Sequence, residues 1–229
     1  MLLLINDDGI HAPGMAALER AVAEWGPYVV VAPQEHLSGC GHQTTTHRPM
    51  RATALAPNRH MLEGLPADCA RLGLTLLAPQ TEWVLSGINE GGNLGADVYS
   101  SGTVAAAREA ALLGRPAIAV SHYVRRGIPI DWERAARWTG QVVRTLMARP
   151  REAGIYWSVN LPHLPQIEGT EMPPLVDCRL DGNPLPVTYR REEAGYVYAG
   201  NYHLRQRDAG ADVDVCFSGR ISVVRLAVR

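Results

Sequence analysis

The sequence contains no lysine, and all 22 of its basic residues are arginine. This absence excludes a phosphate-binding loop that depends on a lysine, and it also excludes Schiff-base chemistry. If the protein binds phosphate, the ligands must be backbone N–H groups, hydroxyl groups, arginine or a metal ion.

Cysteine is scarce. The four cysteines, at positions 40, 69, 178 and 216, lie far apart and form no CxxC pair. This spacing argues against a zinc knuckle or a redox motif, and it predicts reduced, mostly buried thiols in a cytoplasmic protein. A formal net charge of −1 gives no reason to expect a nucleic-acid polymer or an anionic membrane as a partner.

Long hydrophobic runs are also missing. No apolar stretch approaches the roughly 18 residues that a membrane-spanning helix needs. The apolar run at residues 2–5 is too short for a signal peptide and has no basic residues before it. The sequence therefore predicts a protein without a membrane segment.

The first part of the chain alternates short apolar runs with helical patterns, which predicts an α/β protein. The runs expected to form buried strands are residues 2–5, 28–33, 82–87, 116–121 and 155–162. Helical periodicity begins at Pro13, at Pro66, near Thr103 and at Asp131. Continuous apolar strands separated by helices indicate a parallel sheet covered on both faces, a Rossmann-like three-layer sandwich.

The pattern changes after about residue 165. Prolines cluster at positions 173, 174, 184 and 186, and the segments 196–205 and 220–229 alternate between apolar and polar residues. We therefore expect an α/β core over residues 1–165. Residues 166–229 are expected to form a smaller β-rich region that packs on the core and exposes a hairpin.

Two adjacent carboxylates, Asp7 and Asp8, follow the first predicted strand directly. Ligands of open α/β sheets bind beyond the carboxyl ends of the strands, where these side chains are expected. Two neighbouring carboxylates repel each other unless a positive charge lies between them, and a hard divalent cation prefers oxygen ligands. The alternative is that Asp-Asp-Gly only forms a turn and a helix cap.

Polar residues also follow the other predicted strands. Ser38 lies in a glycine-bounded loop, and Asn89 and Asn93 lie in a glycine-rich segment. Ser101, Gly102 and Thr103 lie where a helix begins, and the free N–H groups and hydroxyls of such a start suit a phosphate group. Four polar clusters at successive strand ends predict a metal site beside an anion site.

Three blocks of sequence carry a resemblance to a known family. The segments "NDDGIHAPG", "SGINEGGNLGADV" and "SGTVAAAREAALLGRPAIAVS" resemble the signature blocks of the survival protein E family, SurE, whose members are metal-dependent nucleotidases. The resemblance implies that one divalent metal ion is held by Asp7, Asp8, Ser38 and Asn89. It also implies that the phosphate site is bordered by Asn93, Ser101, Gly102 and Thr103.

The resemblance further implies hydrolysis of nucleoside 5′- and 3′-monophosphates to nucleoside and phosphate, and activity on short polyphosphate. It implies support by Mn²⁺, Mg²⁺ or Co²⁺ and a homodimer or homotetramer with the C-terminal region between subunits. Asp7 and Asp8 are also the candidate catalytic residues. The residues themselves do not decide whether a carboxylate is a general base or a nucleophile.

Three other classes of protein compete with this interpretation. A phosphatase of the haloacid dehalogenase kind needs a second Asp two residues after the first and a distant lysine, and the chain lacks both. A dinucleotide-binding enzyme needs GxGxxG after the first strand, which is absent. A metal-stabilised nucleotide-binding protein without turnover would use the same ligands and stays open. His11, His42, His47 and Tyr99 are further candidates for contact with substrate.

Overall fold

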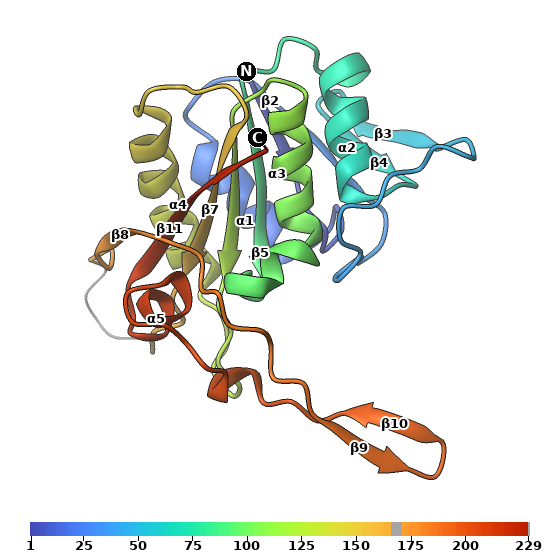
Figure 1. Ribbon diagram of the computed structural model, residues 1–229. Coiled ribbons are helices and arrows are strands. Elements are labelled where there is room, and N and C mark those ends of the chain that lie inside the picture. Colours follow the sequence, from blue (N-terminus) through green and yellow to red (C-terminus); the bar gives the residue numbers. More distant parts are fainter. Residues whose placement is uncertain (166–170, 229) are drawn as a thin grey trace.

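The computed structural model describes residues 1–165 and 171–228. Its centre is a nine-stranded sheet in the order β3-β4-β2-β1-β5-β6-β7-β11-β8 (Figure 1). The five predicted strands are confirmed as β1 (Leu2–Ile5), β2 (Tyr28–Pro33), β5 (Trp83–Glu90), β6 (Ala117–His122) and β7 (Ile155–Leu161). These five strands pair with one another in parallel.

Helices cover both faces of the sheet, so the expected three-layer α/β sandwich is confirmed. The helices α1 (Pro13–Val22) and α4 (Trp132–Met147) pack in one hydrophobic cluster, against side chains such as Leu4. The helices α2 (Pro66–Leu72) and α3 (Gly102–Leu112) pack in a second cluster, against side chains such as Leu3. Because neighbouring strand residues point to opposite faces, one apolar strand supplies both clusters.

Several elements escape the sequence patterns. A pair of strands, the exposed β3 (Ala52–Ala56) and the half-buried β4 (Arg59–Leu62), extends the sheet beyond β2. A π-helical turn (Gly73–Leu77) follows α2, and a 3₁₀-helix (Gly95–Tyr99) precedes α3. A second 3₁₀-helix (Tyr202–Leu204) and the short helix α5 (Asp212–Phe217) lie in the C-terminal part.

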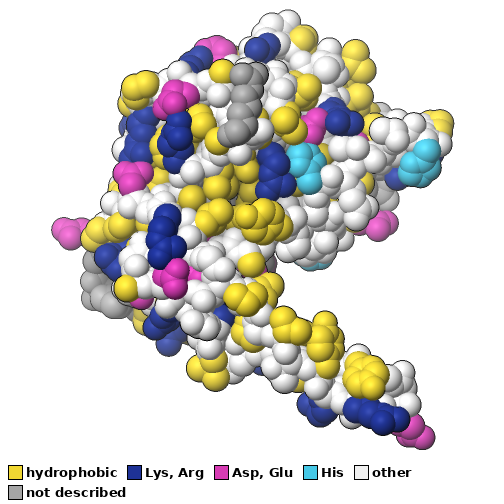
Figure 2. All heavy atoms as spheres, viewed as in Figure 1, with side chains coloured by type: hydrophobic (Ala, Val, Ile, Leu, Met, Phe, Trp, Pro, Cys, Tyr) yellow, Lys and Arg dark blue, Asp and Glu magenta, His cyan; other side chains and the backbone are white. Residues whose placement is uncertain are grey.

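The C-terminal part contributes to the main sheet and also leaves it. The strand β11 (Ile221–Ala227) pairs antiparallel with β7, and β8 (Leu175–Cys178) pairs with β11. The strands β9 (Tyr189–Glu192) and β10 (Gly195–Tyr198) form the expected separate hairpin. It extends away from the rest of the molecule, and hydrophobic and arginine side chains lie on its surface (Figure 2).

The expected boundary at residue 166 lies outside the described residues. Within residues 1–165 and 171–228, no helix is both long enough and apolar enough to span a bilayer. The four cysteines are all free; Cys69 and Cys216 are buried, and Cys40 and Cys178 are half-buried.

The strand order places a switch point at β1. The chain runs from β1 to its neighbour β2 on one side, whereas β5, its neighbour on the other side, is followed by β6 in the opposite direction along the sheet. Loops on the two sides of such a point diverge and leave a crevice at the carboxyl ends of the strands. The residues that follow β1, β2 and β5 are those that the sequence singles out.

Candidate active site

The carboxylate of Asp7 lies against the first turn of α3. The hydroxyl of Thr103 donates a hydrogen bond to it. Asp7 is buried, and burial raises the pKa of its carboxyl above the usual range, although the hydrogen bond from Thr103 opposes this. This contact therefore joins the carboxyl end of β1 directly to the beginning of α3.

Gly102 permits this close approach. A Cβ atom at position 102 would lie 2.8 Å from Oδ2 of Asp7 and 2.9 Å from the sulfur of Cys40. No residue with a side chain fits between them without displacing one of them. The preceding residue, Ser101, caps α3, because its hydroxyl accepts a hydrogen bond from the backbone N–H of Val104 at 3.1 Å.

Asp8 has one satisfied and one unsatisfied oxygen. Its Oδ2 accepts a hydrogen bond from the backbone N–H of Glu90 at 2.9 Å. Its Oδ1 is buried and has no hydrogen-bond partner among the described residues, and Nδ1 of His36 lies 3.2 Å from it. Burial and the neighbouring Asp7 raise the pKa of Asp8 to about 6. A cavity of about 320 Å³ opens beside Asp8, His36 and Glu90.

The loop that carries Ser38 is attached to the site at both of its ends. The backbone N–H of Leu37 donates to the carbonyl of Asp7 at 2.7 Å, and the N–H of Gly41 donates to the carbonyl of Ser100 at 2.9 Å. Ser38 is exposed between these two attachments. The loop thus bridges the end of β1 and the beginning of α3.

Asn89 is buried at the end of β5. Its side-chain N–H₂ group donates to the carbonyl of Gly91 at 2.8 Å, so the amide oxygen is the atom left for another partner. Since the next residue, Glu90, donates to Asp8, the end of β5 lies directly beside the end of β1.

Asn93 belongs to a second set of contacts, at the ends of β6 and β7. Its side-chain nitrogen donates to the hydroxyl of Ser121 at 2.7 Å. Its backbone N–H donates to Oδ1 of Asn160 at 2.8 Å, and Nδ2 of Asn160 donates to the carbonyl of Asn93 at 3.1 Å. These bonds fix the position of Asn93 on two neighbouring strands.

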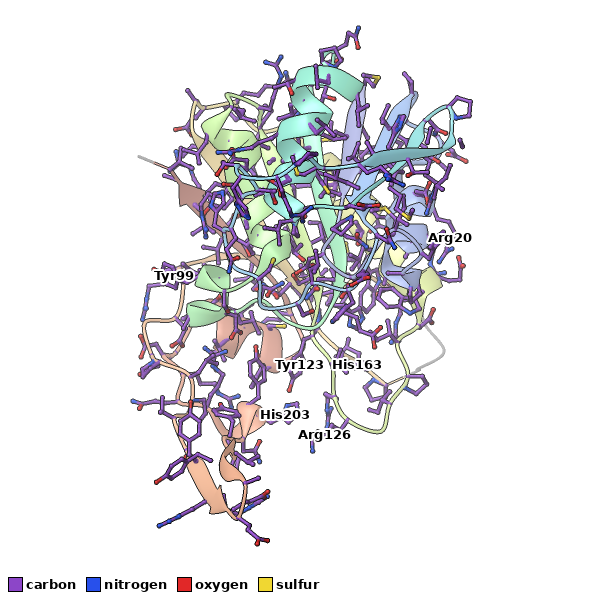
Figure 3. The ribbon with its side chains drawn as sticks, turned by 90° about the vertical axis from the view of Figure 1, so that its right-hand side faces the viewer. Arg20, Tyr99, Tyr123, Arg126, His163 and His203 are labelled. Carbon is purple, nitrogen blue, oxygen red and sulfur yellow. The ribbon has the colours of Figure 1, made fainter. Side chains whose placement is uncertain are left out.

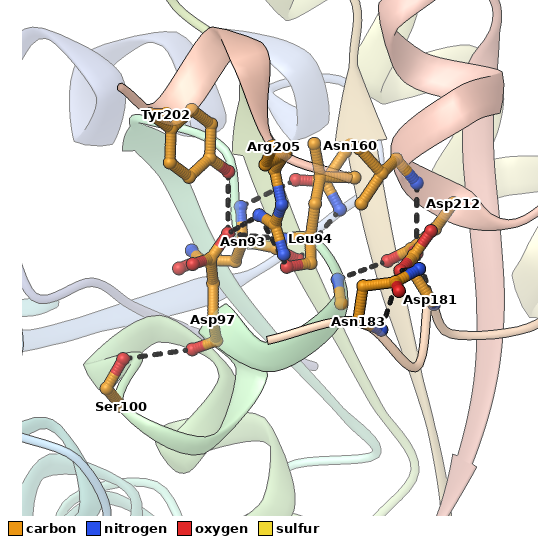
Figure 4. A network of polar contacts seen from close by, with 12 residues as sticks. Asn93, Leu94, Asp97, Ser100, Asn160, Asp181, Asn183, Tyr202, Arg205 and Asp212 are labelled. Atoms are coloured by element: carbon orange, nitrogen blue, oxygen red, sulfur yellow. Dashed lines mark hydrogen bonds and ion pairs between the residues drawn. The ribbon is translucent and has the colours of Figure 1, made fainter. Parts of the chain in front are cut away.

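Residues of the C-terminal part form hydrogen bonds with the segment 94–97, which follows Asn93. Asp97 accepts hydrogen bonds from the hydroxyl of Tyr202 at 2.6 Å and from Arg205 at 3.0 Å, and Arg205 also donates to the carbonyl of Leu94 (Figure 4). Asp212 accepts a hydrogen bond from the N–H of Gly95 at 2.7 Å. Residues beyond position 200 therefore fix the loop between β5 and α3.

The predicted site residues fall into two adjoining groups. Contacts join the strand ends and the helix start that carry Asp7, Asp8, Ser38, Asn89, Ser101, Gly102 and Thr103. Asn93 lies in the neighbouring group with Ser121 and Asn160. Thr103 is fully buried, and its hydroxyl is directed to Asp7. Thr103 is therefore a positioning residue for that carboxylate.

Among the described residues, the other candidates make no hydrogen bond or ion pair with Asp7 or Asp8. Those two carboxylates contact Thr103, Glu90 and His36. His11 and His47 are exposed, and His42 contacts Glu109 at 2.7 Å. The side chain of Tyr99 is 74% exposed and lies at the periphery of the molecule (Figure 3), so it is not a core residue of this chain.

Sequence reasoning missed His36, Glu90, Ser121 and Asn160. Ser121 and Asn160 end the apolar strands β6 and β7, so the rule that found the other strand ends also applies to them. His36 and Glu90 carried no such signal, because their roles depend on how two loops approach Asp8.

The fold and these contacts define an α/β protein whose polar side chains gather at the carboxyl ends of its parallel strands. The sequence profile of the family described as "Survival protein SurE" matches residues 2–180. A putative 5′-nucleotidase of Nostoc sp. is 48% identical over 99% of both chains. The 5′-nucleotidase SurE of Citrifermentans bemidjiense is 43% identical over 99% of this chain and 92% of its own.

A solved structure agrees with this assignment. The crystal structure of the SurE protein from Aquifex aeolicus is similar to all of this chain, with a TM-score of 0.86 and 32% identity over 93% of its own length. The chain belongs to the SurE family.

Proposed function

We propose that this protein is a 5′-nucleotidase that hydrolyses nucleoside monophosphates to nucleoside and inorganic phosphate at the site around Asp7 and Asp8. Its SurE relatives are named 5′-nucleotidases. The observation that carries the proposal is the buried pair of carboxylates beside the N-terminus of α3, an arrangement suited to a cation and a phosphate group together.

We further propose that one divalent cation is bound by Asp7, Asp8, Ser38 and Asn89. The residues fit such an ion, because Oδ1 of Asp8 is buried without a hydrogen-bond partner among the described residues. Two carboxylates, a hydroxyl and an amide oxygen are the hard ligands that Mg²⁺ and Mn²⁺ prefer, and Co²⁺ is the third candidate. When bound, the cation would neutralise charge on the phosphoryl group as the P–O bond breaks.

The phosphate group is proposed to lie between α3 and Asn93. The first turn of α3 offers the positive end of its helix dipole at Ser101, Gly102 and Thr103. Asn93 donates one amide hydrogen to Ser121 and retains a second for a phosphoryl oxygen. Since Asn160 fixes the backbone of Asn93, this donor is positioned before substrate binds.

The same proposal extends to 3′-monophosphates and short polyphosphate, which present the same terminal phosphoryl group. The preference among these substrates depends on what surrounds the rest of the molecule. Asp7 and Asp8 serve as catalytic residues as well as ligands. Inorganic phosphate release from a panel of phosphomonoesters, with and without divalent metal, tests the proposal. Binding of nucleotides without any release would favour a nucleotide-binding protein.

We also propose that the protein forms a homodimer or homotetramer in which the hairpin β9–β10 contacts another subunit. Tyr189, Tyr196 and Tyr198 are exposed on this hairpin, as is Val197. A two-stranded ribbon with aromatic side chains in water is only marginally stable by itself. Burial of these side chains against a second copy of the chain would stabilise it.

A further inference from the structure

A second cavity lies next to the carboxylates, at the carboxyl ends of β2 and β4. Its volume is about 380 Å³, within the range of small-molecule sites. Its lining comes from Gln34, Glu35 and Leu37, which follow β2, and from residues 62–65, at the end of β4. Arg48, from the end of the loop that carries Ser38, also lines the cavity.

This cavity is in direct contact with the end of β1. Leu37, which lines it, donates its backbone N–H to the carbonyl of Asp7 at 2.7 Å. A Cβ atom on Gly9 would lie 3.4 Å from the backbone of Glu35, another lining residue. The wall of the cavity therefore packs against the residues on either side of Asp8.

The spacing between the strands suits a substrate that extends from the carboxylates at the end of β1 to the cavity at the end of β4. The strand β1 pairs with β2, and β2 pairs with β4. Two steps between neighbouring strands amount to about 9.6 Å, the length scale of a nucleoside. In addition, the cavity lies at the start of α2, and the proposed phosphate site lies at the start of α3. These two helices pack together on one face of the sheet (Figure 1), so their starting points are neighbours.

The lining of the cavity matches a nucleoside in its chemistry. Leu37, Leu62 and Leu65 supply apolar surface. Arg48 donates to the carbonyls of Pro49 and Glu63, each at 3.3 Å, so its planar guanidinium is held in place. A fixed guanidinium plane is a surface on which a base stacks.

The charges of the lining indicate which end of a nucleotide enters. Glu35 and Glu63 line the cavity together with Arg48, so carboxylates outnumber the cation among these residues. Glu35 forms no ion pair with the other described residues. A free carboxylate only accepts hydrogen bonds, so it favours hydroxyl groups such as those of ribose and disfavours a second phosphate.

We infer that this cavity binds the ribonucleoside part of the substrate, with the base against Arg48 and a ribose hydroxyl on Glu35. The inference rests on the proposed nucleotidase function, since it assigns the remainder of the same substrate. It makes the segment 34–37 and Arg48 determinants of specificity, separate from the groups that hold the phosphate.

The test compares a nucleotide with a phosphomonoester that lacks a nucleoside. Arg48→Ala and Glu35→Ala are measured with AMP, with 2′-deoxy-AMP and with p-nitrophenyl phosphate, at saturating Mn²⁺. Arg126→Ala and Glu24→Ala are the matched controls, because both side chains are exposed and neither lines the cavity. Binding of adenosine, which has no phosphate, is measured separately by calorimetry.

We expect Arg48→Ala to raise KM for AMP about tenfold or more, with kcat and the p-nitrophenyl phosphate activity unchanged. Glu35→Ala should reduce the preference for AMP over 2′-deoxy-AMP, and both variants should weaken adenosine binding. If both variants hydrolyse p-nitrophenyl phosphate normally and their KM values for AMP equal that of the wild type, the nucleoside site is contradicted. The proposed nucleotidase function is not affected by that result. Absence of hydrolysis of every phosphomonoester would instead contradict the proposed function, and adenosine binding would still decide whether the cavity is a nucleoside site.

Discussion

The hydroxyl of Thr103 donates a hydrogen bond to the carboxylate of Asp7, although 96 residues separate the two in the chain. This relationship joins the end of the central strand β1 to the start of α3. Asp7, a proposed cation ligand, and the first turn of α3, the proposed phosphate-binding site, are therefore linked directly. A change in Asp7 or in Thr103 should displace both the cation ligand and the phosphate-binding site.

Replacement of Thr103 tests this unit. Thr103→Val keeps the shape of the side chain but removes the hydroxyl, so Asp7 loses a donor and its pKa rises further. We expect kcat/KM to fall by about 10²-fold and Mn²⁺ affinity, measured by calorimetry, to fall with it. Thr103→Ser restores the hydroxyl and should retain most activity. Equal losses in both variants would show that the hydroxyl is not what positions Asp7.

The contact between Gly102 and Asp7 gives a steric prediction. In Gly102→Ala, the new Cβ would lie 2.8 Å from Oδ2 of Asp7, so the carboxylate or the helix must move. We expect activity to fall by about 10²-fold or more, because displacements of about 1 Å have effects of this size. Circular dichroism and the Tm establish whether the fold remains.

Gly182→Ala is the matched control, since a Cβ there meets no atom within 4 Å. It should leave both activity and Tm unchanged. Full activity of Gly102→Ala would contradict the proposed geometry of the site.

The raised pKa of Asp8 predicts how stability depends on pH. Its pKa is about 6 in the folded protein without metal, against an ordinary value of 3.8 that applies to the unfolded chain. Between these values the folded state binds the extra proton. The contribution of Asp8 to stability is therefore complete below pH 3.8 and is lost as the pH rises through about 6.

The corresponding measurement is the Tm of chelated protein between pH 4 and pH 7.5. Asp8→Asn should lose less stability over this range than the wild type, since the amide does not titrate. Added Mn²⁺ should raise the wild-type Tm above pH 6, because a cation stabilises the ionised pair. The same pH dependence in both proteins would argue against a raised pKa at Asp8.

The hairpin β9–β10 predicts the state of assembly. Tyr196→Ser combined with Val197→Ser removes apolar surface that is exposed in the single chain. If the hairpin contacts another subunit, sedimentation velocity should show a smaller species or a higher dissociation constant than for the wild type. Tyr99→Ser is the control, because Tyr99 is equally exposed but lies outside the hairpin. An unchanged distribution of species would remove the hairpin from the interface.

The sequence predicted the central strands and most helices because their apolar patterns are local. The run 28–33 is a buried strand of six residues, and Pro13 begins α1 as expected. The same reasoning did not find β3 and β4, because β3 is exposed and neither has a continuous apolar run. Helix α5 is only six residues long, too short for a clear helical period.

The candidate site was predictable to the extent that it lies at strand ends. Asp7 and Ser38 follow β1 and β2, and Asn89 lies at the end of β5, so the parallel order alone brings them to one edge. The hydrogen bond from Thr103 and the proximity of His36 to Asp8 depend on the paths of two loops. The path of neither loop follows from a periodic sequence pattern. The cavity beside Arg48 also depends on the paths of these loops, so it could not be predicted either.

The most direct test of the account is inorganic phosphate release from a panel of nucleoside 5′- and 3′-monophosphates. The wild type and Asp8→Asn are assayed after chelation and again with Mn²⁺ or Mg²⁺ restored, beside Asp177→Asn, whose carboxylate is exposed on β8. We predict release that requires the metal, is normal in Asp177→Asn and is reduced about a thousandfold or more in a folded Asp8→Asn. Release that persists without metal, or that is unchanged in Asp8→Asn, would contradict the account.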